Sequence, residues 1–139
     1  MLVSSPGLSG CCRDHYIGNV GWAGPGRLLA TFLPRSQTSH FTVLCSGPAW
    51  TCNTISTEHC SPLPACWLEN RGLPLLHPTR PELVAIQGVL EGGAGRYPQL
   101  VRGGVAGGGA GVALTRGRGE VTALLGWDPE SDLVHIHTS

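Results

Sequence analysis

Residues that interrupt regular secondary structure are unusually frequent in this chain. Glycine and proline together make up 32 of its 139 residues, close to the roughly 25–30% that is typical of low-complexity chains. Glycine loses the most backbone freedom on folding, and proline cannot donate a backbone hydrogen bond. The sequence therefore predicts short elements, much coil, a partly disordered chain and no cooperative unfolding transition.

Large apolar residues are nevertheless numerous enough to form a core. Leucine, valine, isoleucine and phenylalanine are 34 of the 139 residues, and the net charge is zero, so neither composition nor charge repulsion requires an unfolded chain. We expect residues 1–139 to form a single small domain or a largely disordered chain. Within it, the Gly/Arg-rich segment 92–119 is expected to be flexible.

The best helical pattern lies near residues 81–91. Pro81 suits the first position of a helix, and the Glu82 carboxylate would lie in the first turn, where the helix dipole favours it. A glycine pair at 92–93 could end the helix. Three apolar residues fall on one helical face: Leu83, Ile86 and Leu90.

Some β structure is expected beside this helix. Residues 41–45 are rich in β-branched and aromatic side chains and predict a strand. Residues 120–127 and 133–138 predict a C-terminal hairpin around a turn at 128–132, with a helix starting at Asp128 as the alternative. The apolar run 28–33 is compatible with helix or strand. The expected fold class is an irregular, weakly folded α+β chain.

The basic residues are all arginines, and the chain contains no lysine. The absence of lysine excludes a P-loop lysine, a Schiff-base lysine and a kinase-type lysine. A composition rich in Gly, Pro, Ala and Arg and poor in Lys, Asn and Ile matches GC-rich codons. It favours a little-constrained open reading frame as the origin of the chain.

The first candidate is a metal site. Its possible ligands lie close together in the sequence and are Cys45, Cys52, His59, Cys60 and Cys66. Zinc sites usually use two close pairs of ligands, and only the adjacent His59 and Cys60 come near that spacing. We therefore expect no metal and no cofactor. The first residues lack a signal-peptide pattern, so we also expect a cytoplasmic location by default and six free thiols.

Two histidines provide a second possible metal site. His135 and His137 would point to the same side of a strand, but alternation with Val134 and Ile136 explains their spacing without a metal. Cys11 and Cys12 are possible palmitoylation targets that lack a second membrane anchor. No local motif selects a Cys–His pair for nucleophilic catalysis.

RNA binding is suggested by the Arg/Gly segments 102–104 and 116–119. Segments of this kind bind single strands through charge and aromatic stacking. Here three arginines stand without a neighbouring aromatic residue, in a chain of zero net charge. The electrostatic pattern of a nucleic-acid-binding protein is therefore missing.

These observations predict a small non-enzymatic protein with no catalytic, cofactor-binding or metal-binding residues. A protein partner is possible, and neither a membrane span nor nucleic-acid binding is indicated. The alternative is a cysteine-rich binding module that folds on a metal or on a protein partner.

Overall fold

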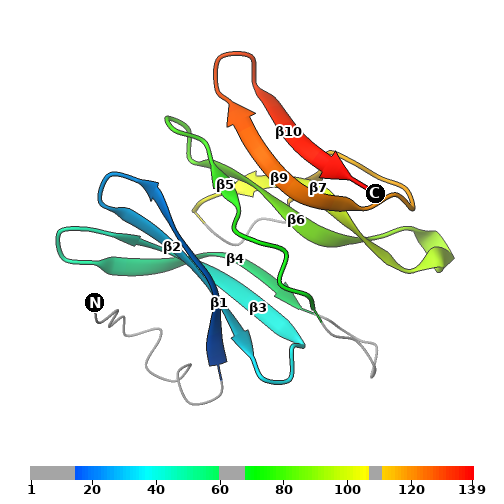
Figure 1. The fold of residues 1–139 in the computed structure, drawn as a ribbon, viewed down its shortest axis with the longest axis horizontal. Coiled ribbons are helices and arrows are strands. Elements are labelled where there is room, and N and C mark those ends of the chain that lie inside the picture. Colours follow the sequence, from blue (N-terminus) through cyan, green and yellow to red (C-terminus); the bar gives the residue numbers. More distant parts are fainter. Residues whose placement is uncertain (1–14, 60–67, 107–110) are drawn as a thin grey trace. The chain divides into compact units, whose positions relative to one another are not determined.

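The structure is a computed structural model that describes residues 15–59, 68–106 and 111–139. The described residues form ten β-strands and one 3₁₀ turn, η1 (Gly92–Ala94), and no α-helix (Figure 1). The expectation of a weakly folded, partly disordered α+β chain with much coil is therefore wrong. No helix in these ranges is long and apolar enough to cross a membrane.

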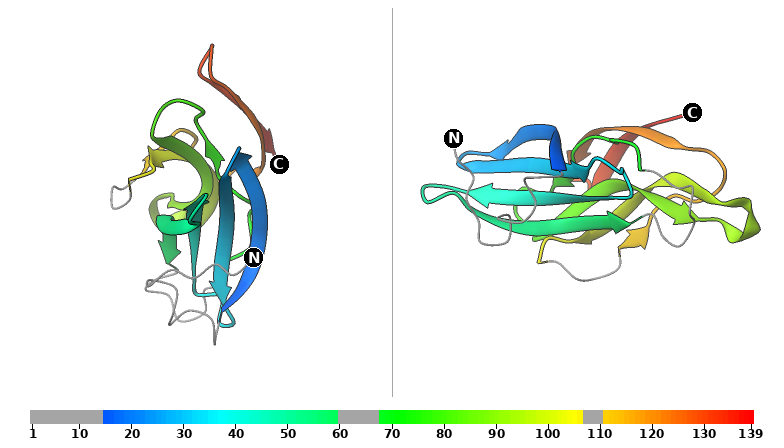
Figure 2. Two further views of the ribbon diagram at one scale, coloured as in Figure 1. Left: turned by 90° about the vertical axis from the view of Figure 1, so that its left-hand side faces the viewer. Right: turned by 90° about the horizontal axis from the view of Figure 1, so that it is seen from below.

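Contacts divide the chain into two compact units, Met1–Leu73 and Pro74–Ser139. The prediction of a single domain is untested and stays a prediction. The first unit is one antiparallel sheet in which each strand pairs with the next, as Figure 2 shows from two further directions. Its strands are β1 (His15–Gly24), β2 (Arg27–Pro34), β3 (Ser39–Ser46) and β4 (Thr51–His59).

The second unit contains a four-stranded antiparallel sheet and a separate two-stranded hairpin. The sheet follows chain order again, and the hairpin comes after it. The strands are β5 (Leu75–Leu76), β6 (Glu82–Leu90), β7 (Arg96–Gly104), β8 (Val112–Ala113), β9 (Val121–Asp128) and β10 (Leu133–Thr138). The strand predicted at 41–45 and the C-terminal hairpin are confirmed, and the undecided run 28–33 is a strand.

The helix predicted near 81–91 is wrong, because these residues form β6. Four consecutive residues of this strand are buried, from Leu83 to Ile86. A helix would turn some of them to solvent, whereas a strand covered on both faces buries them all. β6 also pairs with β7 along its whole length. The glycines expected to cap a helix instead form η1, between the two strands.

Part of the segment 92–119 belongs to this sheet. β7 is hydrogen-bonded to β6, and β8 is paired with β7. The flexibility of 92–119 as a whole is not tested by these pairings and stays a prediction.

One face of the first sheet carries an apolar cluster built from three strands. Phe32 and Phe41 stack with ring centroids 5.3 Å apart, and Trp50 packs against the same cluster. On the opposite face of β2 and β3, the buried hydroxyls of Thr31 and Thr42 hydrogen-bond to each other at 3.0 Å. The buried residues of the cluster are Leu28, Ala30, Phe32, Val43, Cys45 and Cys52.

Two glycines in β1 allow the segment 68–73 to lie against this strand. A Cβ atom on Gly18 would collide with the buried Leu33 side chain, and one on Gly21 would lie 2.7 Å from Leu73. Gly18 is left out of the ladder with β2, and the Asn70 side chain donates a hydrogen bond to its carbonyl at 3.0 Å. The only local sequence signal for this packing is the pair of glycines itself.

Cys45 and Cys52 stand opposite each other in the register of β3 and β4 and form a disulfide. The prediction of six free thiols is therefore wrong for these two residues. Both are buried, at 0% and 7% exposure. The bond closes the β3–β4 hairpin at the end where Trp22 and Trp50 approach with ring centroids 6.0 Å apart.

Replacing Gly18 by alanine is expected to destabilise the first unit. The added methyl group would displace Leu33 or Asn70, and such overpacking typically costs about 1–3 kcal/mol. Urea denaturation would measure the change. Gly126→Ala is the matched control, because a Cβ on this strand glycine meets nothing within 4 Å. Equal stability of Gly18→Ala and the wild type would contradict the described packing.

Removing the disulfide is expected to lower the free energy of unfolding by about 2–3 kcal/mol, because the unfolded chain regains the freedom of the closed loop. Urea denaturation with and without reductant would test Cys45→Ala/Cys52→Ala against the wild type. Reductant should lower the wild-type midpoint and leave that of the double variant unchanged. A chain whose other four cysteines are serine should respond like the wild type. A wild-type urea midpoint that is the same with and without reductant would contradict the presence of the disulfide.

Candidate functional site

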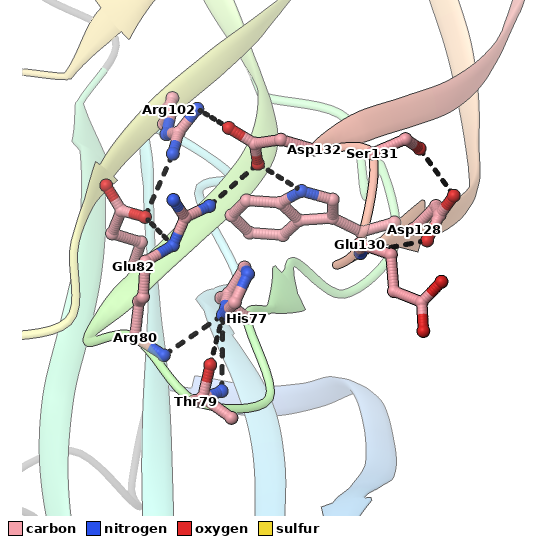
Figure 3. Close-up of polar contacts among 10 residues, drawn as sticks. His77, Thr79, Arg80, Glu82, Arg102, Asp128, Glu130, Ser131 and Asp132 are labelled. Carbon is pink, nitrogen blue, oxygen red and sulfur yellow. Dashed lines mark hydrogen bonds and ion pairs between the residues drawn. The ribbon is translucent and has the colours of Figure 1, made fainter.

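The densest group of charged side chains in the described residues lies in the second unit (Figure 3). Two arginines and two carboxylates alternate there. Arg80 contacts Glu82 at 2.8 Å and Asp132 at 2.7 Å, and Arg102 contacts the same two carboxylates at 2.9 and 3.2 Å. β6 and β7 contribute Glu82 and Arg102, whereas Asp132 comes from the β9–β10 turn. We call these four residues the ionic cluster.

Trp127 connects the ionic cluster to the hairpin. Its indole Nε1 donates a hydrogen bond to the Asp132 carboxylate at 3.0 Å, across the β9–β10 turn. The Arg102 guanidinium lies 5.4 Å from the ring centroid, within the range of a cation–π contact. Asp132 adopts a positive φ of 56°, which places its side chain toward both arginines. A single carboxylate thus contacts two arginines and one tryptophan.

His77 packs against Trp127 and has a defined tautomer. The two rings meet edge to face with centroids 4.9 Å apart. His77 Nδ1 accepts hydrogen bonds from the backbone N–H groups of Thr79 and Arg80, at 3.2 and 3.0 Å. A ring nitrogen that accepts these bonds carries no proton, so the ring proton resides on Nε2. Nε2 is buried and has no conventional hydrogen-bond partner in the described part of the chain.

The β9–β10 turn is also held by Asp128. Its carboxylate accepts hydrogen bonds from the backbone N–H of Glu130, at 3.0 Å, and from the Ser131 hydroxyl. The bond from Ser131 is the main reason that the pKa of Asp128 lies below its ordinary value of 3.8. The turn predicted at 128–132 is therefore fixed by its own side chains.

The carboxylates of the ionic cluster are stabilised in their charged form. A hydrogen bond from Arg102 lowers the pKa of Glu82 below its ordinary 4.5, and the bond from Trp127 is the largest cause lowering that of Asp132 below 3.8. The same bond to Glu82 raises the pKa of Arg102. Two positive and two negative charges offset each other. This arrangement suits attachment of the hairpin to the sheet better than proton transfer.

The first unit holds a smaller buried group of charges. Glu58 is 7% exposed and contacts His40 Nε2 at 3.0 Å and Arg71 at 3.4 Å. His40 and Glu58 are directly opposite in the β3–β4 register. Since Arg71 belongs to the segment that lies against β1, this pairing ties the segment to the far edge of the sheet.

Among the sequence candidates for metal binding, Cys45, Cys52 and His59 lie in the described residues and form no metal site there. The sulfurs of Cys45 and Cys52 are bonded to each other, so neither is available as a thiolate ligand. Cys60 and Cys66 lie outside the described residues, as do Cys11 and Cys12. In the described parts of the chain, no three His, Cys, Asp or Glu side chains gather in a way that could hold a metal ion.

The two histidines of β10 are both exposed, as alternation predicts. Thr122 contacts His137, with its hydroxyl 3.3 Å from Nδ1 and 3.1 Å from the backbone oxygen. Of the arginines considered for RNA binding, Arg102 belongs to the ionic cluster, while Arg116 and Arg118 are exposed. Sequence reasoning missed the ionic cluster, since Arg80 and Asp132 lie 52 residues apart. The only local signal was the turn that starts after Trp127.

Acidification is expected to release Trp127 from Asp132. The pKa of Asp132 is lowered in the folded protein, so its ionised carboxylate stabilises the fold at pH values above the ordinary pKa of 3.8. This stabilisation is lost as the pH falls through the lower pKa of the folded state. The Trp127 indole N–H resonance should therefore titrate with a midpoint below 3.8. Asp132→Asn should shift the resonance at neutral pH and remove the titration. A midpoint at or above 3.8 would contradict the assignment.

A search of curated proteins found no match to the chain. A family model does match: the dipeptidyl peptidase IV (DPP IV) N-terminal region aligns with residues 4–137. This family is of the β-propeller type, in which four-stranded antiparallel sheets are the repeating unit. The prediction of a small protein of unknown role from a little-constrained reading frame is therefore wrong. The alternative, a cysteine-rich binding module that folds on a metal or a protein partner, is wrong as well. The chain belongs to the family of the dipeptidyl peptidase IV N-terminal region.

Proposed function

We propose that the chain supplies blades to a propeller-type N-terminal region of a peptidase-family protein, as a scaffold without catalytic residues of its own. The observation that carries this proposal is the strand order. Two sheets of four antiparallel strands follow each other along the chain, and every strand pairs with its neighbour in sequence. Propeller blades have this construction.

An exposed apolar strip on β1 supports the proposal. Ile17, Val20 and Trp22 are 57%, 54% and 69% exposed. Their register partners on β2 are Phe32, Ala30 and Leu28, which belong to the buried apolar cluster. Opposite residues of paired strands share a face, so the strip extends the core face of the first sheet. We call these three residues the β1 strip.

The β1 strip fits another sheet as its packing partner. A repeat unit cannot bury its apolar face alone, and stacking against a neighbouring unit completes the core. Large apolar side chains that project from one face of a strand suit face-to-face packing between sheets. The proposed partner is therefore another four-stranded sheet of the same propeller.

The side chains of the ionic cluster are consistent with a scaffold role. Each carboxylate is neutralised by two arginines, and the cluster joins a hairpin to a sheet. The family match concerns the N-terminal region of a peptidase and does not by itself give the chain hydrolytic activity. In this proposal, peptide-bond cleavage is the task of residues outside the matched N-terminal region.

Polar replacement of the β1 strip is expected to reduce association of the chain. Each apolar side chain removed from the strip lowers the gain from burial by about 1.5–3 kcal/mol at most. Sedimentation velocity over a concentration series would compare the wild type with Ile17→Thr/Val20→Thr/Trp22→Ser. The wild type should associate with rising concentration, and the variant should remain monomeric.

Leu90→Thr/Leu125→Thr is the matched control, because both leucines are similarly exposed, at 60% and 66%, in the second unit. This control should associate like the wild type. Circular dichroism would establish that all variants keep their β structure. Association that is unchanged in the β1 strip variant would contradict the packing role, and hydrolysis of a dipeptide nitroanilide by the purified chain would contradict the scaffold role.

A further inference from the structure

A segment at the edge of the second sheet presents a row of exposed side chains. Residues 112–118 begin with β8, the edge strand beyond β7, and continue toward β9. Every second residue is exposed, and the residues between them are half-buried. The row consists of Val112 (66% exposed), Leu114 (47% exposed), Arg116 and Arg118. We call this row the 112–118 ledge.

Hydrogen bonds to β7 hold the apolar half of the ledge in place. The backbone N–H of Leu114 donates to the Leu100 carbonyl at 2.8 Å. The Leu100 N–H in turn donates to the Thr115 hydroxyl at 2.9 Å. The segment therefore continues along β7 beyond the two residues of β8.

A buried glutamine holds the basic half. Gln99 is 1% exposed, and its side-chain amide donates to the carbonyls of Gly117 and Gly119, at 2.9 and 2.8 Å. The Glu91 carboxylate accepts the N–H of Gly117 at 3.0 Å. Gly117 has a φ of 106°, a conformation that side chains rarely adopt. These bonds fix the backbone on both sides of Arg118 and directly after Arg116, and both arginine side chains are exposed.

The two arginines differ in this respect from the ion-paired arginines of the chain. Arg71, Arg80 and Arg102 all contact carboxylates. Within the described residues, Arg116 and Arg118 have no ion pair. A guanidinium binds a carboxylate with two parallel hydrogen bonds, so two exposed guanidiniums separated by one residue favour a partner with two carboxylates. An extended peptide with acidic residues at alternate positions carries two carboxylates on one side, about 7 Å apart.

We propose that the 112–118 ledge is a docking site for an extended protein segment that carries two apolar residues and two carboxylates at alternate positions. The apolar side chains would lie on Val112 and Leu114, and the carboxylates on Arg116 and Arg118. This proposal is independent of the scaffold role of the chain. A protein segment fits better than RNA, because the row contains no aromatic residue for base stacking and Glu120 follows it closely.

Binding of a designed peptide would test the ledge. The probe is a fluorescent seven-residue peptide with two valines followed by two glutamates at alternate positions and threonine between them, used together with its reversed sequence. Fluorescence anisotropy would measure binding to the 139-residue chain. At least one orientation should bind. Replacing its glutamates by glutamine, or making Arg116→Ala/Arg118→Ala in the chain, should weaken binding about tenfold.

Two further variants separate the ledge from general charge effects. Arg35→Ala removes another exposed arginine and should leave the affinity unchanged. Arg116→Glu/Arg118→Glu should lose the acidic peptide and bind a version with lysine in place of glutamate. The proposal would be overturned if neither peptide orientation bound, or if the affinity were unchanged in Arg116→Ala/Arg118→Ala. It would also be overturned if single-stranded RNA competed more strongly than the unlabelled peptide.

Discussion

Antiparallel pairing between strands that are adjacent in sequence is the constraint on which this structure depends. In both four-stranded sheets, each strand hydrogen-bonds the strand that precedes or follows it in the chain. Such pairing needs only short connections, and these can accommodate the many glycines and prolines. The same residues that argue against long regular elements are thus compatible with a sheet built from hairpins. The core then needs only apolar residues at the paired positions.

This constraint explains which parts of the fold the sequence could predict. The C-terminal hairpin was predictable because alternation and a turn lie within one short segment. β6 was misread because Leu83, Ile86 and Leu90 also have helical spacing, while burial on both faces depends on elements elsewhere in the chain. The disulfide depends on the register of β3 and β4, which the spacing of cysteines alone does not give. The ionic cluster joins residues too far apart for any local pattern to connect.

The absence of lysine also has a structural counterpart. Arg102 contacts two carboxylates and an indole ring at once. A planar guanidinium with five donors can form this set of contacts, whereas an ammonium group offers a single point of charge. Whatever the origin of the codon bias, arginine performs a role in this cluster that lysine could not take over.

The carbonyl of Gly18 has a further consequence for how β1 meets other molecules. A long strand at the edge of a sheet invites foreign strands to add to its free backbone groups, which leads to aggregation. The pairing of β1 with β2 is irregular at two points, between Ile17 and Asn19 and between Trp22 and Gly24. In addition, the Gly18 carbonyl already accepts a hydrogen bond from the Asn70 side chain. These irregularities make the strand a poor template for strand addition, while its apolar side chains remain accessible. The face of β1 is thus open to packing, whereas its edge is poorly suited to pairing with a foreign strand.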